Sequence, residues 1–465
     1  PDSLDRMEPY YTPPQWLPDG SGFLYSRLRL LPAEALPTEG YKRSRTFLHR
    51  LGHDIDDDPV VFAMDLWPGV SMTEEDFPSI VLTSGSDYAI GKIKHGDANQ
   101  LTLYAAPLSS IATSNTPWKM ICDVADSVTD FAVHGNEIYL KTSRLAPRFK
   151  IVKSPLAKPG FASAIKVIPT SDVVVEGMAA AKDALYVSTY SRGITRIMRI
   201  GYGTGEATLL KLPDNAPAGH IDSTNPLSDG FLFSPASWTR RSGTYSYDPE
   251  TNAFTDTGLN PSGKFDNVPG YESVEVQVLS HDRVMVPLSI VFKSGLKRDG
   301  SNPTLLGGYG SYGHSMDVSF RPTRLAWLER GGIVAVAHVR GGGEYGQEWH
   351  MGGQKLTKPN TWKDFIACAE YLIAEGYTSP EKLAGKGGSA GGILIGRAIT
   401  ERPDLFAAAL LNVGCLDAIR METTTNGIPN IQEFGTVAKE DEFHALLEMS
   451  SYHHVTDGVV YPAVM

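Results

Sequence analysis

Short apolar or aromatic triplets, separated by polar turns, recur through the first 260 residues. They are Phe23-Leu24-Tyr25, Tyr88-Ala89-Ile90, Ile138-Tyr139-Leu140, Leu185-Tyr186-Val187 and Phe231-Leu232-Phe233. The last three recur at about 47 residues, a period typical of a four-stranded propeller blade. Turn signals such as Pro18-Asp19-Gly20 precede several of them. The pattern favours an all-β propeller, incomplete and with about five blades. The alternative is a large β-sandwich in which the spacing is accidental.

The pattern changes after Pro261. The stretch Val274–Val278 alternates as a half-buried strand does, and Ile333–Ala337 is a continuous apolar run. Residues Thr361 to Glu375 predict an amphipathic helix with Phe365, Cys368, Ala369 and Leu372 on its core face. Apolar strands alternating with helices indicate a mostly parallel sheet with helices on both faces. We therefore expect a propeller domain at 1–260 and an α/β domain at 261–465.

Composition narrows the functional classes. The formal net charge is −11 and there is no long basic run, which argues against a nucleic-acid partner. No apolar stretch is long enough to span a membrane. Cys122, Cys368 and Cys415 lack metal or disulfide spacing, so we expect small buried hydrophobes. His53, His95, His134 and His220 also lack ligand spacing. We expect no metal and no cofactor.

The segment Gly387-Gly388-Ser389-Ala390-Gly391-Gly392 satisfies the pattern G-x-S-x-G. In that pattern the serine occupies a strained turn between a strand and a helix, where its hydroxyl is exposed. A short strand at Lys382–Ala384 and a helix containing Ile393, Leu394, Ala398 and Ile399 supply this context, which Ser311 lacks. The sequence predicts Ser389 as a nucleophile, with the Ala390 N–H as an oxyanion donor.

Several further segments resemble the prolyl oligopeptidase family of serine peptidases. They are Gly308-Tyr309-Gly310-Ser311-Tyr312, Val339 to Gly346, Gly387 to Gly392 and Arg402-Pro403-Asp404-Leu405-Phe406, with a weaker likeness at Phe47 to Gly52. The resemblance implies an α/β-hydrolase domain capped by a seven-bladed propeller that filters peptides by size. It also implies that the Tyr309 hydroxyl donates to the oxyanion. Arg340 and Glu344 are expected to be a structural pair that steadies the loop beside the site.

The fold requires an Asp and then a His after the serine. The candidates in this chain are Asp404, Asp417, Asp441 and Asp457, with His444, His453 and His454. In the family, however, the aspartate follows the strand that Tyr461 to Val464 resembles, so we expect both residues beyond Met465. The chain begins with Pro1 rather than Met, and we expect a fragment truncated at both ends.

The segment Asn430 to Gly435 resembles the wall of the family's S1 pocket. Asn430 stands where prolyl enzymes have a tryptophan, whereas the oligopeptidase B branch uses acidic residues in this pocket. Phe434 and Tyr312 keep aromatic rings near the site, so we expect Tyr312, Asn430 and Phe434 to bind substrate. These residues are compatible with an apolar S1 pocket and with cleavage after proline, but they do not establish either.

The leading interpretation is a serine oligopeptidase acting on short peptides through an acyl-enzyme on Ser389. The alternatives are an acyl-peptide hydrolase or esterase, and a catalytically inactive scaffold that uses the propeller for binding. We expect a monomer with no nucleic-acid or membrane partner. The expected compartment is the cytoplasm, with the periplasm or secretion as alternatives.

Overall fold

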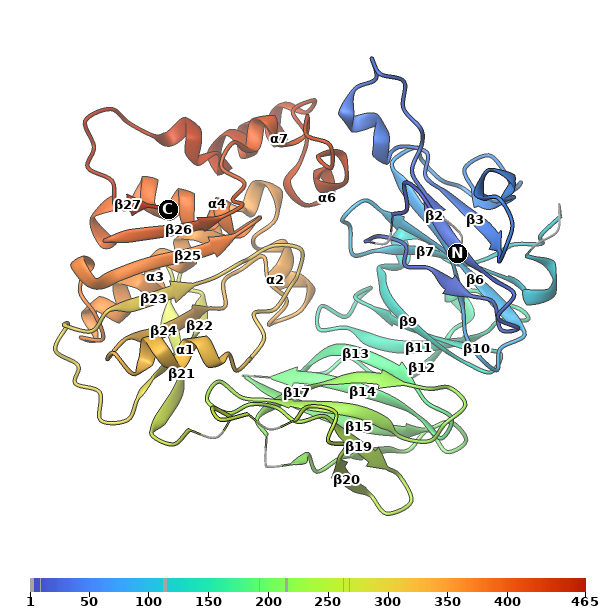
Figure 1. Ribbon diagram of the computed structural model, residues 1–465, viewed down its shortest axis with the longest axis horizontal. Helices are drawn as coiled ribbons and strands as arrows, with labels where there is room; N and C mark the ends of the chain where they lie inside the picture. The colour runs from blue at the N-terminus through green and yellow to red at the C-terminus, as the bar shows by residue number, and fades with distance from the viewer. Residues whose placement is uncertain are drawn as a thin grey trace.

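A computed structural model of the chain describes residues 4–8, 10–111, 115–191, 193–213, 216–261, 263–266 and 268–465. Its first half consists almost entirely of strands, and its second half is a single sheet surrounded by helices (Figure 1). We call strands β1–β20 the propeller part and the elements from β21 onward the hydrolase part.

Five four-stranded sheets make up the propeller part, each antiparallel and in chain order. The strands are β1 Gln15–Trp16, β2 Gly22–Arg27, β3 Arg45–Arg50, β4 Val60–Ala63, β5 Asp76–Leu82, β6 Tyr88–His95, β7 Leu101–Pro107, β8 Lys119–Cys122, β9 Val128–His134, β10 Glu137–Thr142, β11 Lys150–Pro155, β12 Ile165–Ile168, β13 Val174–Ala180, β14 Ala184–Ser191, β15 Ile194–Gly201, β16 Ala207–Leu209, β17 Ala218–Thr224, β18 Phe231–Ala236, β19 Tyr245–Asp248 and β20 Ala253–Asp256. The prediction of about five blades is confirmed.

The apolar triplets all occupy the same place in these sheets. Each lies in the second strand of its blade, in β2, β6, β10, β14 and β18. Most of their side chains are buried; Leu24, Ile138 and Leu185, for example, are almost inaccessible to solvent. The second strand has a partner on both sides, so its backbone hydrogen bonds are satisfied while its side chains reach neighbouring blades. The repeat in the sequence therefore reflects a repeat in packing.

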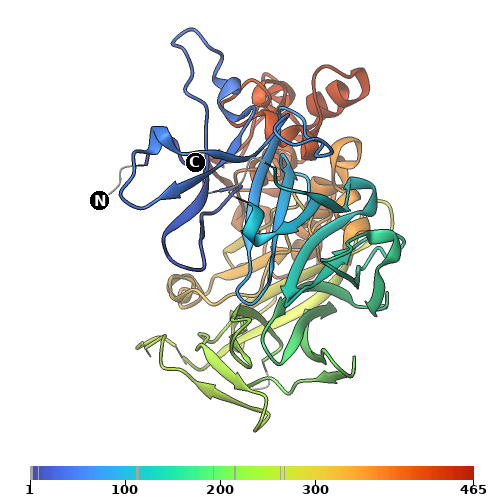
Figure 2. The same cartoon turned by 90° about the vertical axis from the view of Figure 1, so that its right-hand side faces the viewer.

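Consecutive blades follow one another in an arc beside the hydrolase part (Figure 1). The first strands of neighbouring blades contact each other, as β1 does with β5 and β13 does with both β9 and β17. Figure 2, turned by 90°, shows the blades in front of the hydrolase part. Residues of both parts line the two cavities between them.

The hydrolase part is built on one seven-stranded sheet with the order β21-β22-β24-β23-β25-β26-β27. Its strands are β21 Tyr271–Leu279, β22 Met285–Lys293, β23 Thr304–Gly307, β24 Ile333–Ala337, β25 Leu383–Gly388, β26 Ala408–Asn412 and β27 Ala463–Val464. β21 and β22 are antiparallel to their neighbours, and the strands from β24 to β27 pair in parallel. The mostly parallel sheet is as predicted.

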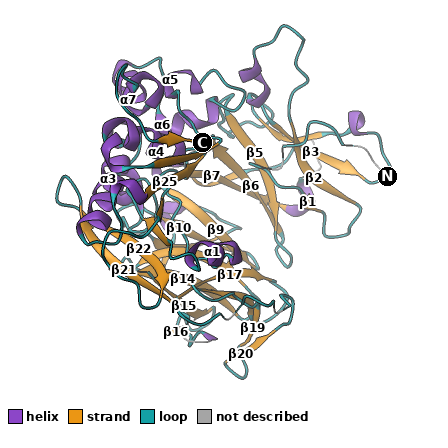
Figure 3. Cartoon of the chain, turned by 60° about the vertical axis from the view of Figure 1, so that its left-hand side comes forward, coloured by secondary structure: helices purple, strands orange, loops and turns teal. Residues whose placement is uncertain are grey.

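Helices cover both faces of this sheet, also as predicted (Figure 3). They are α1 Pro322–Leu328, α2 Gln347–Met351, α3 Pro359–Ala374, α4 Gly391–Glu401, α5 Ala418–Met421, α6 Ile431–Phe434 and α7 Glu440–Met449. Val291 and Val334 pack with Leu325 and Leu328 of α1 on one face. Ile290 and Ala335, one position along each strand, join the core formed with α3 and α4. Adjacent strand residues face opposite sides, so the two helix layers lie on opposite faces.

The predicted amphipathic helix is α3, which buries Phe365, Cys368, Ala369 and Leu372. The division expected near residue 260 falls between β20, which ends at Asp256, and β21, which begins at Tyr271. The domain boundary itself stays a prediction. Among the described residues, no helix is both long and apolar enough to cross a membrane.

Candidate active site

Ser389 lies at the turn that joins β25 to α4. Its φ is +52°, in the left-handed region that a residue with a side chain rarely adopts. The residue is exposed, whereas the following Ala390 is buried. The strand, strained turn and helix are those that the G-x-S-x-G pattern predicts. Strain of this kind persists only where the surrounding structure enforces it.

Two glycines leave the room that this turn needs. A Cβ at Gly387 would lie 2.3 Å from the carbonyl oxygen of Gly391, across the turn. A Cβ at Gly392 would lie 2.4 Å from the Cα of Gly414. Both collisions are with backbone atoms that cannot swing away. The glycines therefore let the start of α4 pack against β25 and against the loop after β26.

Backbone hydrogen bonds to the end of β26 hold the serine in place. The Ser389 N–H donates to the carbonyl oxygen of Asn412 over 3.0 Å. The Cys415 N–H donates to the carbonyl oxygen of Ser389, also over 3.0 Å. The Ser389 backbone is thus fixed on both sides, which directs its side chain away from the sheet.

Two proton donors adjoin the Ser389 hydroxyl. Ala390 caps the N-terminus of α4, and no hydrogen bond within the described part of the chain engages its N–H. A free N–H at a helix N-terminus favours a developing negative charge. Tyr309 follows β23 and lines the same cavity as Ser389, whose side chain interacts with its phenol. Burial raises the pKa of Tyr309 to about 12, so the phenol keeps its proton at neutral pH.

The serine opens into a cavity of about 840 Å³ between the two parts. Tyr309, Tyr312 and Asn430 line it from the hydrolase part, together with Ser389. Tyr11, Lys94, Asp97 and Asn99 line it from the propeller part. Sequence reasoning missed these four residues, because none carries a local motif and their proximity to Ser389 arises only when the two parts fold together.

Tyr312 and Asn430 form one wall of this cavity. The Tyr312 hydroxyl donates to Asn430 Oδ1 over 2.6 Å, and the Asn430 amide donates to the carbonyl oxygen of Asn426 over 2.8 Å. Tyr312 has a φ of +60°, and burial raises the pKa of its phenol. Phe434 is fully buried and contacts the Tyr312 ring edge-on, with the ring centroids 5.5 Å apart. Phe434 thus lies behind the wall and is not among the residues lining the cavity.

A buried polar network underlies the wall. The Lys358 ammonium donates to the carbonyl oxygen of Gly310 over 2.5 Å and to Ser311 Oγ over 2.6 Å. Glu433 Oε1 accepts from the Tyr312 N–H over 2.8 Å, and its Oε2 lies 2.7 Å from His350 Nε2. Burial alone would raise the pKa of Glu433, but the His350 hydrogen bond and the Lys358 charge hold it below its ordinary value. The network ties the turn after Tyr309 to α6.

Arg340 and Glu344 do not pair with each other, so that expectation is wrong. Arg340 donates to Asp364 through its backbone N–H, Nε and Nη2, and to Asp282 through Nη1 and Nη2. Glu344 accepts from the Met316 N–H over 2.9 Å and lies 3.4 Å from His338 Nδ1. Asp364 belongs to α3 and Asp282 to the β21–β22 turn, so Arg340 finds two acids close to its own strand end. Each residue steadies a different segment.

Several of the acids and histidines that follow Ser389 have partners of their own. Asp404 pairs with Arg402, and Asp417 accepts from the Arg420 N–H at the start of α5. His453 Nδ1 lies 2.8 Å from Ser450 Oγ, and His454 Nδ1 lies 2.8 Å from the Ser450 carbonyl oxygen. In the described residues, no hydrogen bond joins any of these side chains to Ser389. The histidine that does line the Ser389 cavity is His314, which the sequence reading did not select.

Cys122 and Cys368 are buried, as expected. Cys415 is only partly buried and lines the Ser389 cavity, so that expectation is wrong. Its N–H is held by the Ser389 carbonyl, which draws the residue to the cavity edge. Across the described ranges, no group of three or more His, Cys, Asp or Glu residues could hold a metal ion.

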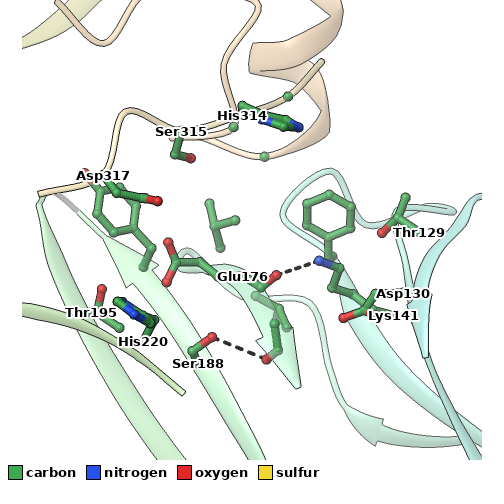
Figure 4. A pocket seen from close by; sticks show the side chains of 18 of the residues that line it. Thr129, Asp130, Lys141, Glu176, Ser188, Thr195, His220, His314, Ser315 and Asp317 are labelled. Carbon is green, nitrogen blue, oxygen red and sulfur yellow. Dashed lines mark hydrogen bonds between the residues drawn. The ribbon is translucent and has the colours of Figure 1, made fainter. Parts of the chain in front are cut away.

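A second cavity, of about 530 Å³, lies between the two parts (Figure 4). Tyr312 and His314 line both cavities. Glu176 of β13 and Asp317 of the hydrolase part direct their carboxylates into the second one. Burial, reinforced by the charge of Asp317, raises the pKa of Glu176 to about 7. Glu176 is therefore expected to change its protonation state near neutral pH.

Both family profiles and individual known proteins match the sequence of this chain. The profile described as "Prolyl oligopeptidase, N-terminal beta-propeller domain" matches residues 1–256, and "Prolyl oligopeptidase family" matches residues 318–465. A prolyl endopeptidase of Elizabethkingia meningoseptica is 31% identical over 97% of this chain and 62% of its own length. The dual function macrocyclase-peptidase POPB of Galerina marginata is 29% identical over 97% of this chain and 61% of its own length.

Solved structures of prolyl endopeptidases and prolyl oligopeptidases also resemble this chain. A structure from a study of two prolyl endopeptidases superposes with a TM-score of 0.85 at 29% identity, covering 97% of this chain and 64% of its own. Prolyl oligopeptidase B from Galerina marginata, bound to a macrocyclization substrate, superposes with a TM-score of 0.89 at 26% identity, covering 100% of this chain and 64% of its own. The chain thus spans less than two thirds of the length of these relatives.

Proposed function

Because this chain belongs to the prolyl oligopeptidase family, we propose that it carries the nucleophile of a serine oligopeptidase that cleaves short peptides. Ser389 is the nucleophile in this proposal, and Tyr309 and Ala390 provide the oxyanion site. The observation that supports it best is the exposed serine on a strained turn, with a partly buried phenol and a helix-terminal N–H beside it.

The reaction proceeds in two steps, formation of an ester on Ser389 and hydrolysis of that ester. The Ser389 Oγ attacks the carbonyl carbon of the scissile amide while a base takes its proton. The negative charge on the former carbonyl oxygen faces the Tyr309 hydroxyl and the Ala390 N–H. The C–N bond then breaks, and the amine leaves with the proton held by the base. Water hydrolyses the resulting ester, which releases the acid and restores the Ser389 hydroxyl.

In this proposal, none of the described histidines that follow Ser389 acts as the base. His453 and His454, two of the histidines after Ser389, are engaged by Ser450. A histidine and an aspartate outside residues 1–465, in the order Ser, Asp, His, would complete the site. Loss of such partners removes several orders of magnitude in rate, so the chain alone would be nearly inactive.

Tyr312 and Asn430 are proposed to bind the residue before the scissile bond. They line the cavity of Ser389 and are joined by a hydrogen bond. The aromatic face of Tyr312 suits an apolar residue such as proline, whereas the amide of Asn430 makes part of the wall polar. Phe434 contributes by packing behind Tyr312. We further propose a monomeric, cytoplasmic protein that takes short peptides through the interface between its two parts.

Chromogenic peptides test this function in the protein at its natural length. Gly-Pro and Gly-Arg substrates of equal length should show cleavage that the Ser389→Ala variant loses while it keeps its circular dichroism spectrum. A large unfolded protein should resist cleavage, because the propeller part restricts access. Equal cleavage by wild type and Ser389→Ala would overturn the assignment of Ser389. Folded wild-type protein that cleaves neither peptide would instead favour a binding scaffold.

A further inference from the structure

A single turn of the propeller part contacts both segments that form the Tyr312–Asn430 wall. The turn comprises residues 96–100 and connects β6 to β7; we call it the bracing turn. The Asp97 N–H donates to the carbonyl oxygen of Pro429 over 3.0 Å. The Asn99 side-chain amide donates to the carbonyl oxygen of Tyr312 over 3.0 Å. Figure 1 shows α6, which follows Pro429, at the edge of the hydrolase part that faces the propeller part.

These contacts close a ring of hydrogen bonds across the interface. Asn99 holds Tyr312, the Tyr312 hydroxyl holds Asn430, and Asp97 holds the residue before Asn430. The two backbone carbonyl oxygens belong to a loop at Tyr312 and to the short 3₁₀ helix Ile428–Asn430, and no other backbone N–H of the described residues donates to them. The bracing turn thus satisfies acceptors that would otherwise depend on water.

The base of the bracing turn is itself fixed. His95, the last residue of β6, lies 2.7 Å from Asp76 Oδ1 through Nδ1 and 2.9 Å from Thr102 Oγ1 through Nε2. The Ala98 N–H donates back to the His95 carbonyl oxygen over 3.0 Å. A turn anchored in this way transmits the position of its blade to whatever it contacts.

The contact with Pro429 leaves no space for a side chain at Gly96. Its φ is +55°, and a Cβ there would lie 2.7 Å from the Pro429 carbonyl oxygen and 3.1 Å from the Pro429 Cα. Both are backbone atoms. The turn between β9 and β10 offers a natural comparison, because Gly135 has a φ of +54° with no atom within 4 Å of its Cβ position. Gly96 and Gly135 share their backbone conformation, but only Gly96 has atoms close to its Cβ position.

We infer that the bracing turn is a positioning device: Gly96, Asp97 and Asn99 build the substrate-binding wall only when the propeller part is seated on the hydrolase part. This inference rests on the proposed peptidase function. Seating of the propeller part then couples closure of the cavity to completion of the wall at Tyr312 and Asn430. Neither Asp97 nor Asn99 needs to touch the reacting atoms for this role.

The test compares Gly96→Ala, Asn99→Leu and the control Gly135→Ala in the protein at its natural length. Gly96→Ala and Gly135→Ala pay the same backbone cost, but only the first collides with Pro429. Asn99→Leu keeps a branched side chain and removes the donor to Tyr312. We expect KM for a Gly-Pro peptide to rise about three- to tenfold in the first two variants, the range set by one lost hydrogen bond. The value of kcat and the rate of labelling by a small fluorophosphonate should stay within about twofold.

Hydrogen exchange supplies a second readout that does not depend on activity. Amides in 310–313 and 430–435 should exchange faster in Gly96→Ala and Asn99→Leu than in wild type or Gly135→Ala. Unchanged exchange and KM in both variants would overturn the inference, as would equal changes in Gly135→Ala. If wild type cleaves no peptide, the proposed function fails, while the exchange experiment still decides whether the turn orders the wall.

Discussion

Replacing Lys358 by methionine should strongly destabilise the hydrolase part. Lys358 is fully buried, and its ammonium bonds the Gly310 carbonyl oxygen and Ser311 Oγ. It also lies 3.9 Å from Glu433 Oε1 and 5.2 Å from the centroid of the Phe434 ring. Methionine keeps an unbranched apolar stem out to Cε and lacks only the terminal ammonium. The change therefore removes the charge and the donors with little loss of packing.

The expected loss follows from what stays behind in the core. Two buried acceptors, on Gly310 and Ser311, lose their donor, and each unsatisfied group costs about 1–3 kcal/mol. Glu433 loses its nearby cation but keeps the His350 and Tyr312 bonds. Removing one partner of a buried ionic group costs about 3–5 kcal/mol, which we take as the expected total.

Lys355 provides a matched control three residues earlier. Its ammonium lies 3.3 Å from Glu442 Oε1, and its side chain is 28% exposed. Lys355→Met should cost about 0–1 kcal/mol, as is usual for an ion pair near the surface. Urea unfolding followed by tryptophan fluorescence would compare the two, because Trp349 and Trp362 are buried close to this region. A loss below about 1 kcal/mol for Lys358→Met, or an equal loss for Lys355→Met, would refute the reasoning.

Two further predictions concern the oxyanion site and the acidic interface. Tyr309→Phe should lower kcat for peptides by about 10²-fold, since it removes one of two oxyanion donors, and steady-state kinetics that show a change below about fivefold would contradict this. Since burial raises the pKa of Glu176 from 4.5 to about 7, its contribution to stability is present below pH 4.5 and is lost as the pH rises through 7. Glu176→Gln should remove this pH-dependent change, on the order of 3 kcal/mol, from unfolding free energies measured between those pH values. Glu206→Gln, at an exposed turn, should keep it.

Local patterns in the sequence predict the parts of the structure that depend on neighbouring residues. The elbow at Ser389 follows from glycines within three residues of it, whose missing side chains the turn requires. The blade triplets follow from burial of the second strand in each sheet. In both cases the physical constraint acts over a few consecutive residues, so it can be recognised in the sequence.

The rest of the site depends on residues far apart in the chain. Arg340 bonds Asp282 and Asp364 rather than the nearby Glu344, because the β21–β22 turn and α3 bring those acids to its strand end. Lys94, Asp97 and Asn99 reach the Ser389 cavity only through the packing of one part on the other. Nothing in the spacing of these residues distinguishes them from ordinary turn residues. Their role requires the relative placement of two parts, which local patterns do not encode.

In the proposed reaction, the Ser389 hydroxyl is the nucleophile. The most direct measurement is to label the protein at its natural length with a fluorophosphonate and to locate the adduct by peptide mass spectrometry. The account predicts a single adduct on the peptide containing Ser389, together with loss of labelling in Ser389→Ala. An adduct on another serine, or labelling that persists in Ser389→Ala, would contradict it.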